Sequence, residues 1–328
     1  MISISEKKWE KQQVNKNLVE KVKQDYDYSE TISKIILSRK FDESEIYSID
    51  NNIQISNVFK ENYDYKKSIE IVSSAILNKE KICIFGDYDV DGSAATSLFI
   101  RFFKSINQDF FYYIPDREKD GYGPSIEVFK KLIKKKPKLI IMVDCGSTSH
   151  DAIKFLNLNN IKSIIIDHHE IDKPYPEANC IINPKKNNGY IEYEYFCATT
   201  LTYYFIDLLK DIINKKFNIT DYLIYVLLAS VCDVMPLRKI NRFIAKIVIN
   251  KIKINKNKVF SEIFNIKGNK KNINIDDLGY LIGPILNSGG RLGKSFYATE
   301  LLSSDNENEI INKTKKLILL NEKRKIIE

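Results

Sequence analysis

The sequence predicts an α/β protein with a doubly wound, mainly parallel sheet, helices before the sheet and further helices after it. Between residues 81 and 184, short continuous apolar runs alternate with amphipathic helical patterns, which is typical of a parallel sheet covered on both faces. Residues before 65 and after 197 show helical patterns. We therefore expect a helical preface at 1–64, a sheet domain at 65–240 and a helical completion of the core at 241–328.

The elements follow one another in a regular order. In the preface, YSETISKIILSRKF predicts a short capped amphipathic helix. The predicted strands are KICIFGD, FFYYIP, LIIMVDCG, KSIIIDHH and CIINP. The helices between them are SAATSLFIRFFKSI, SIEVFKKLIKK and SHDAIKFLNL. The later helices are ATTLTYYFIDLLKDIINKK, DYLIYVLLASVCDV, RFIAKIVINKIK and a final helix from about residue 305.

Composition limits the class of protein. With 328 residues, 44% of them apolar, the chain can bury a sizeable core. The sequence contains neither a membrane-spanning apolar run nor a signal peptide, so we expect a cytoplasmic location without a membrane partner. The five cysteines are scattered in apolar runs, which favours core thiols over disulfides or a zinc site. The net charge of +8 is mild, and lysine runs such as 130–138 fit the outer face of a helix that Pro137 ends. Charge alone therefore does not indicate a nucleic-acid partner.

Acidic side chains follow three of the predicted strands. The aspartates of GDYDVDGS, Asp87, Asp89 and Asp91, come directly after KICIF. Asp144 follows LIIMV, and Asp167 follows KSIII. A single strand-end aspartate is usually a helix N-cap, but three strands ending in this way predict convergence, because ligands of open parallel sheets bind beyond the carboxyl ends of the strands.

Two known types of ligand-binding loop could explain the first acidic cluster, and the sequence excludes both. DYDVDG matches the start of an EF-hand calcium loop, but position twelve is Leu98 where that loop needs a glutamate, and a strand precedes it where a helix is required. A dinucleotide-binding loop is also excluded, because acids between Gly86 and Gly92 would repel a pyrophosphate. Crowded carboxylates call for cations instead.

Divalent ions supply the charge that clustered aspartates need. The carboxylates suffice for two ions, roughly 3.5–4 Å apart, as in phosphoryl-transfer enzymes, so the residues predict a dinuclear phosphoesterase. The imidazoles of His168 and His169 shift the preference from Mg²⁺ toward Mn²⁺ or another transition ion. Because neighbours in an extended segment point to opposite sides, we expect one histidine to bind metal while the other meets the phosphate or the second ion. His150, at a helix start, receives no role.

Three later segments add candidates. Asp233 follows an apolar helix, where the helix dipole makes a negative charge unfavourable without a cation. GPILNSGGRLG at 283–293 predicts a small-residue loop in which Asn287 and Arg291 meet a substrate phosphate, against the alternative of a plain turn. Arg117 follows the strand FFYYIP and is placed to reach the same crevice.

Taken together, these motifs resemble the DHH phosphoesterase superfamily and, within it, the bacterial single-strand-specific exonucleases. The resemblance covers most of the chain and rests on GDYDVDG, PDREKDGYG, VDCG, DHHE, INP, CDVMPL, DLGYLIGPILNSGGRLG and LNEKRKIIE in the family's order. CATT and NSGG depart from the family pattern by small-for-small changes.

The resemblance implies a two-metal site, usually manganese with magnesium as the alternative, that hydrolyses single-stranded DNA from the 5′ end in recombination and repair. Its implied metal ligands are Asp89, Asp91, Asp144, His168 and Asp233, with Asp87 and His169 at further motif positions. Asp167, His168 and His169 form the implied catalytic triplet, in which Asp167 orients the histidines. Arg117 and Arg291 match positions that contact DNA phosphates. Candidate protein partners are a single-strand-binding protein and a helicase.

Two other functions stay open at this point. Smaller members of the superfamily hydrolyse short oligonucleotides or cyclic dinucleotides, and a degenerate member would be a non-catalytic replication scaffold. The intact carboxylates disfavour the scaffold. The final helix ends in KRKIIE without a glycine cap or a proline stop, so we expect a connecting helix that leads into a further domain, and weak, distributive hydrolysis without it.

Overall fold

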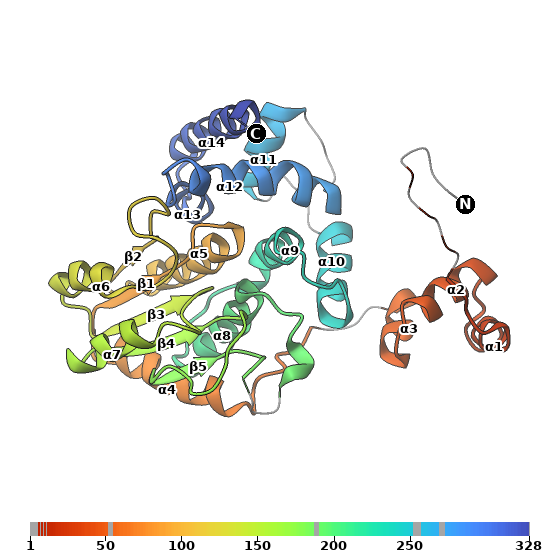
Figure 1. The fold of residues 1–328 in the computed structure, drawn as a ribbon, viewed down its shortest axis with the longest axis horizontal. Helices are drawn as coiled ribbons and strands as arrows, with labels where there is room; N and C mark the ends of the chain where they lie inside the picture. The colour runs from red at the N-terminus through yellow and green to blue at the C-terminus, as the bar shows by residue number, and fades with distance from the viewer. Residues whose placement is uncertain are drawn as a thin grey trace. The chain divides into compact units, whose positions relative to one another are not determined.

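Five parallel strands form the sheet, in the order β2-β1-β3-β4-β5. In this computed structural model the described residues are 6, 8, 10, 12–51, 55–186, 190–251, 257–268 and 273–327. The chain runs outward from β1 to β2, then crosses back to β3 and continues to β5, which confirms the predicted doubly wound fold (Figure 1). The strands are β1 Ile82–Phe85, β2 Phe110–Tyr113, β3 Leu139–Val143, β4 Lys162–Ile166 and β5 Cys180–Ile182.

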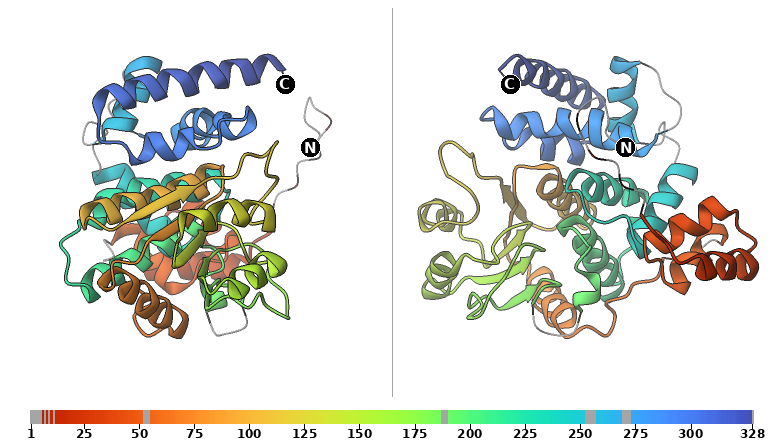
Figure 2. Two further views of the ribbon diagram at one scale, coloured as in Figure 1. Left: turned by 90° about the vertical axis from the view of Figure 1, so that its left-hand side faces the viewer. Right: turned by 45° about the vertical axis from the view of Figure 1, so that its right-hand side comes forward.

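Helices cover both faces of this sheet because β1 and β3, at its centre, are apolar at every position. Alternate residues of β1 point to opposite faces, so Ile82 and Ile84 join one buried cluster while Cys83 and Phe85 join the other. The first cluster includes residues of α4, α5, α8 and α9, and the second includes residues of α6 and α7. Helices accordingly lie on both sides of the sheet (Figure 2). The helices of this part are α4 Tyr63–Leu77, α5 Val90–Ser105, α6 Ile126–Leu132, α7 His150–Leu158, α8 Ala198–Ile212 and α9 Leu223–Cys232.

The chain divides into two units, Met1–Gln54 and Ile55–Glu328. The division lies earlier than the predicted boundary at 64/65, because Phe59 and Tyr65 stack on one another in the core of the second unit, with ring centroids 4.3 Å apart. The second unit also runs across the predicted boundary at 240. In the first unit, Val22, Ile36 and Ile46 form a small apolar core. Its helices are α1 Lys16–Tyr26, α2 Glu30–Ser38 and α3 Glu43–Asp50, and Ser29 caps α2 as the sequence predicted.

Further helices complete the second unit after α9. They are α10 Lys239–Lys251, α11 Lys258–Lys267, α12 Gly283–Arg291, α13 Tyr297–Ser303 and α14 Glu307–Ile327, with a π-helical turn, η5, at Asp277–Ile282 before α12. In Figure 1, α11 to α14 lie together, and α12 packs along α14. Within the described ranges, no helix is long and apolar enough to cross a membrane.

The prediction of a loop at 283–293 was wrong, because most of this segment forms the helix α12. Its small residues allow other elements to approach closely instead of forming a turn. A Cβ atom on Gly283 would lie 2.5 Å from the sulfur of Cys232, and one on Gly290 would lie 2.9 Å from Cδ2 of Tyr88. The left-handed residue that ends this segment is Gly293, with φ of +68°. Asn287 and Arg291 are therefore held on a helix, and Gly290 packs directly against the GDYDVDGS segment.

Candidate metal centre

The GDYDVDGS segment folds tightly from β1 into α5. Asp89 is the N-cap of α5, and its Oδ1 accepts a hydrogen bond from the amide of Gly92 at 2.9 Å. A Cβ atom on Gly92 would lie 2.7 Å from the backbone of Asp87, so only glycine allows the helix to begin this close to the strand end. This turn keeps Asp87 and Asp89 at the carboxyl edge of the sheet.

Asp91 faces the site and also caps the first turn of α8. Its Oδ2 accepts a hydrogen bond from the amide of Ala198 at 2.7 Å, and its Oδ1 accepts one from the amide of Thr199 at 2.8 Å. These amides belong to the first turn of α8, so the carboxylate caps that helix from a different part of the chain. Asp91 Oδ2 also lies 3.6 Å from Nε2 of His168. Asp91 therefore ties α5 to α8 at the edge of the site.

Asp144 lies at the centre of the site. Its amide continues the β3–β4 ladder by donating to the carbonyl of Ile166 at 2.9 Å, and its φ of +61° then turns the chain away. Aspartate tolerates this left-handed conformation, which costs on the order of 1–3 kcal/mol and is common at functional sites. The side chain is 1% exposed, and neither of its carboxylate oxygens has a hydrogen-bond partner among the described residues. Buried carboxylate oxygens that accept no hydrogen bond call for a bound cation.

Asp167 holds the two histidines in place. Its Oδ1 accepts hydrogen bonds from the amides of His168 and His169 and lies 2.7 Å from Nδ1 of His169, while its Oδ2 accepts from the amide of Ser147 at 3.1 Å. Burial alone would raise the pKa of Asp167, but the bonds from His169 and Ser147 hold it below the ordinary 3.8. With both oxygens engaged, Asp167 orients the imidazoles, as the resemblance implies.

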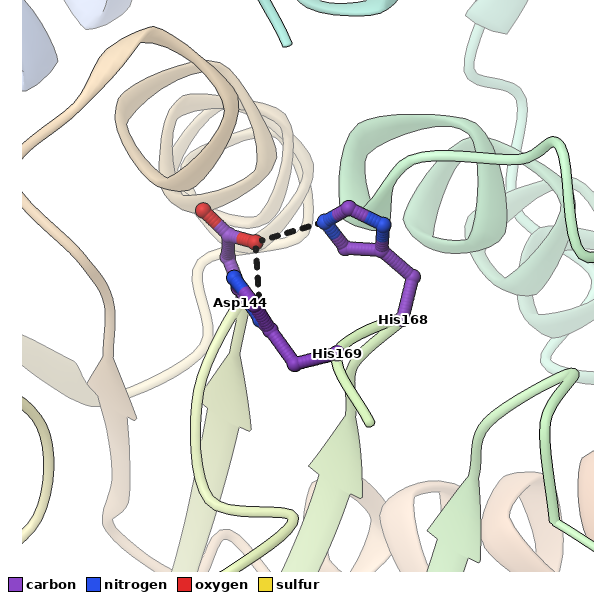
Figure 3. A group of neighbouring side chains, drawn as sticks. All are labelled: Asp144, His168 and His169. Atoms are coloured by element: carbon purple, nitrogen blue, oxygen red, sulfur yellow. Dashed lines mark ion pairs between the residues drawn. The ribbon is translucent and has the colours of Figure 1, made fainter. Parts of the chain in front are cut away.

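Both histidines face Asp144, contrary to the expectation that they diverge. Nε2 of His168 lies 3.3 Å from Asp144 Oδ1, and Nδ1 of His169 lies 3.9 Å from the same oxygen (Figure 3). The alternation rule fails here because β4 ends at Ile166, so the two residues lie in the loop beyond it. Nε2 of His168 is also 3.3 Å from Oδ2 of Asp233, which caps the end of α9.

The side chains fall into groups that could each hold an ion. Within each group the ligand atoms lie within 4.8 Å of one another. The group of Asp144, His168 and His169 shares one member with each of the other two groups, so ions held in those two would be neighbours. They are Asp87, Asp89 and Asp144; Asp91, His168 and Asp233; and Asp144, His168 and His169.

Burial and mutual repulsion raise the pKa values of four acids in the site. Burial, with the nearby charge of Asp89, raises the pKa of Asp87 from 3.8 to about 7, and burial with Asp91 and Asp89 does the same for Asp233. The pKa of Asp89 and that of Asp144 are also raised, by burial first and then by neighbouring carboxylates. Without cations the folded site is therefore electrostatically unfavourable at neutral pH.

We expect the metal-free chain to lose stability as pH rises. Between pH 3.8 and about 7, the raised acids bind more protons in the folded state than in the unfolded state, so the free energy of unfolding falls across this window. It falls further from pH 6.5 to about 9 as His169, whose pKa its bond to Asp167 raises, loses its proton. The pKa of His168 is lowered, so this residue alone makes the free energy of unfolding rise with pH below 6.5. Its effect opposes that of the four acids whose pKa values are raised.

Urea unfolding in a chelating buffer over this pH range measures the effect. Asp87→Asn is the matched variant, because it removes one raised acid and is expected to flatten the slope between pH 4 and about 7. A free energy of unfolding that increases from pH 5 to 7 in the chelated chain would contradict the electrostatic description of the site.

Several predicted residues lie outside these groups. Arg117 is exposed in the loop after β2, close enough to lower the pKa of Tyr88, which burial raises overall. Asn287 and Arg291 lie on α12, whose Gly290 packs against Tyr88, and they belong to none of the ligand groups. His150, which received no role, begins α7 and is exposed.

Asn183 is a structural residue of the site that sequence reasoning missed. It is fully buried after β5, and its Nδ2 donates to the carbonyl of His169 and to Oγ of Ser147, both at 2.9 Å. Ser147 in turn donates its amide to Asp167. The signal was present in the sequence, since Asn183 follows the fifth strand as the acids follow the others.

Acids and imidazoles at the carboxyl edge of a doubly wound parallel sheet, in groups that share members, define a candidate dinuclear metal centre. Residues 81–230, which contain most of it, match the DHH family, N-terminal domain. The chain as a whole is similar to RecJ. It is 24% identical to the single-stranded-DNA-specific exonuclease RecJ of Bacillus subtilis over 98% of this chain and 40% of the relative. To RecJ of Escherichia coli it is 30% identical over 80% of this chain and 48% of the relative.

Solved structures agree on the fold. A crystal structure of exonuclease RecJ bound to manganese has a TM-score of 0.73 at 22% identity, covering 84% of this chain and 68% of that one. RecJ of Thermus thermophilus in complex with Mn²⁺ has a TM-score of 0.78 at 20% identity, covering 94% of this chain and 44% of that one. The chain spans less than half the length of the curated relatives that it matches.

Proposed function

We propose that the chain hydrolyses phosphodiester bonds of single-stranded DNA from the 5′ end with two divalent ions, manganese or magnesium. The observation that carries this proposal is that Asp144 of one ligand group and His168 of another also belong together to a third group. The ligands suit such ions, because Asp144 Oδ1 and Oδ2, Asp87 Oδ1 and His168 Nε2 are buried without hydrogen-bond partners among the described residues. The curated relatives are named single-stranded-DNA-specific exonucleases, which supports the choice of substrate.

The ligand groups suggest how two ions would be held. Asp87, Asp89 and Asp144 would hold one, and Asp91, His168 and Asp233, with Asp144 between the groups, would hold the other. When bound, two such ions polarise the phosphodiester, activate a water and stabilise the leaving oxygen. The mixed imidazole and carboxylate set favours manganese over magnesium.

His169 has a different part in this proposal. In the metal-free chain the hydrogen bond to Asp167 raises its pKa to about 9. Its side chain is 46% exposed, unlike that of His168, which is 8% exposed. When it carries a proton, this accessible imidazole beside the ligand groups would donate a hydrogen bond to a phosphate oxygen and stabilise charge that develops there. Asp167 fixes its orientation.

A nuclease assay on single-stranded DNA labelled at the 5′ or the 3′ end tests the proposal. We expect manganese-dependent release of mononucleotides from the 5′ end and little attack on blunt duplex. Cleavage of dinucleotides or cyclic dinucleotides alone would favour the smaller phosphodiesterases, and metal binding without hydrolysis of any phosphodiester would favour the scaffold. A cytoplasmic location and partnership with a single-strand-binding protein and a helicase stay predictions.

A further inference from the structure

A small cationic cavity lies beside the metal centre, between α9, η5, α12 and α14. Its volume is about 100 Å³, below the roughly 300 Å³ at which pockets begin to accommodate drug-sized ligands, so it fits a single phosphate group rather than a nucleoside. It is lined by Cys232, Asn287, Arg291, Arg324 and the glycines at 279 and 283.

The cavity adjoins the acids through two neighbours in sequence. Cys232 lines the cavity and directly precedes Asp233, a member of one of the ligand groups. On the other side, Arg291 follows Gly290, which packs against Tyr88 of the GDYDVDGS segment. A strand whose reacting phosphate lies at the acids would therefore have a neighbouring phosphate near this cavity.

Arg324 reaches the cavity because of the way that α14 packs on α12. Leu317 is fully buried, and its carbonyl accepts a hydrogen bond from Ser288 of α12 at 3.0 Å. Arg324 lies seven residues further along α14, two turns on and on the same face. Its Nε donates to Oδ1 of the buried Asn321 at 3.2 Å, which orients the guanidinium.

The chemistry of the lining selects an anion. Two guanidinium groups that line one small cavity favour a negative ligand between them, and arginine offers phosphate a two-pronged hydrogen bond. Oδ1 of Asn287 is buried without a hydrogen-bond partner among the described residues. A half-turn of that amide places its donating nitrogen at the same position, which suits a phosphate oxygen.

We propose that Arg324, together with Arg291 and Asn287, binds a backbone phosphate of the DNA strand next to the one at the metal centre. This inference rests on the proposed function and adds Arg324, to which the sequence assigned no role. Arg324 is a positioning residue here, because it holds the strand and does not touch the reacting phosphate.

The test is the salt dependence of binding to a labelled oligodeoxythymidylate with phosphorothioate linkages, which resist hydrolysis, in the presence of Mn²⁺. For single strands, each lost phosphate contact reduces the slope of log affinity against log salt by about 0.7. We expect Arg324→Gln to show this reduction and to bind roughly tenfold or more weakly. Arg324→Lys is expected to restore the slope but not the full affinity, since lysine keeps the charge and loses the fork.

Lys323→Gln is the matched control, because it removes the same charge from the exposed neighbour of Arg324. It is expected to leave the slope and affinity unchanged, and both variants should melt and bind Mn²⁺ as the unaltered chain does. Equal behaviour of the two variants would overturn the proposal. Weaker inhibition by inorganic phosphate in Arg324→Gln, with unchanged binding of the oligonucleotide, would overturn the assignment of this site to the DNA backbone. If the unaltered chain hydrolyses DNA while Arg324→Gln binds normally, only this inference fails; absence of any phosphodiester hydrolysis by the unaltered chain refutes the proposed function.

Discussion

Asp144→Asn is expected to abolish manganese-dependent hydrolysis, with a loss on the order of a thousandfold or more. Asp144 belongs to two of the three candidate ligand groups, and both of its oxygens are buried without hydrogen-bond partners among the described residues. Asparagine keeps the size of the side chain but removes the negative charge that two ions would share. The fold should persist, because loss of a repelled buried charge relieves the metal-free site.

Initial rates at saturating Mn²⁺, for the same single-stranded DNA, measure this effect. Asp151→Asn is the matched control, since Asp151 is an exposed acid in the first turn of α7, the helix that follows the Asp144 loop. The control should retain the rate of the unaltered chain. A rate for Asp144→Asn within a factor of a few of the unaltered chain would show that the acids do not form a shared site.

Asp91→Ala is expected to lower the free energy of unfolding even in a chelating buffer. Its carboxylate accepts hydrogen bonds from the buried amides of Ala198 and Thr199, and each buried donor left unpaired costs about 1–3 kcal/mol. We therefore expect a loss of roughly 2–6 kcal/mol, measured by urea unfolding. Metal-binding residues that serve the metal alone would not show this effect.

Asp233→Ala provides the comparison within the same ligand group. The carboxylate of Asp233 lies near His168 at the end of α9, and burial raises its pKa to about 7. Its removal should weaken metal binding but leave the chelated chain as stable as before, or more stable, at neutral pH. Equal destabilisation by the two alanine variants in chelator would contradict the capping role of Asp91.

The strand-end acids were predictable because position along the chain determines position in space in a parallel sheet. Once KICIF, LIIMV and KSIII are taken as strands, the residues that follow them must lie at one edge, and the structure places Asp87, Asp144 and Asp167 there. The separate roles of these acids could not be read in the same way. Asp91 caps α8 through amides more than a hundred residues away, and no local pattern indicates that contact.

The errors in the sequence reasoning have a common physical origin in packing. Small residues at 283–293 predicted a loop, but they are small because α12 lies against Cys232 and Tyr88. The histidines were expected to diverge as in a strand, but Asp167 draws both amides of the loop toward itself. Arg324 was missed because only the packing of α14 on α12 places it beside Arg291.

The number of Mn²⁺ ions bound per chain tests the central claim most directly. Calorimetric titration of the chelator-treated chain, with electron paramagnetic resonance of the bound ions, should give two ions per chain and a spectrum of magnetically coupled neighbours. Asp87→Asn and Asp233→Asn should each lose one ion, because they belong to different groups, and Asp144→Asn should lose the coupling. A single ion per chain, or two ions without magnetic coupling, would contradict a shared dinuclear centre at Asp144.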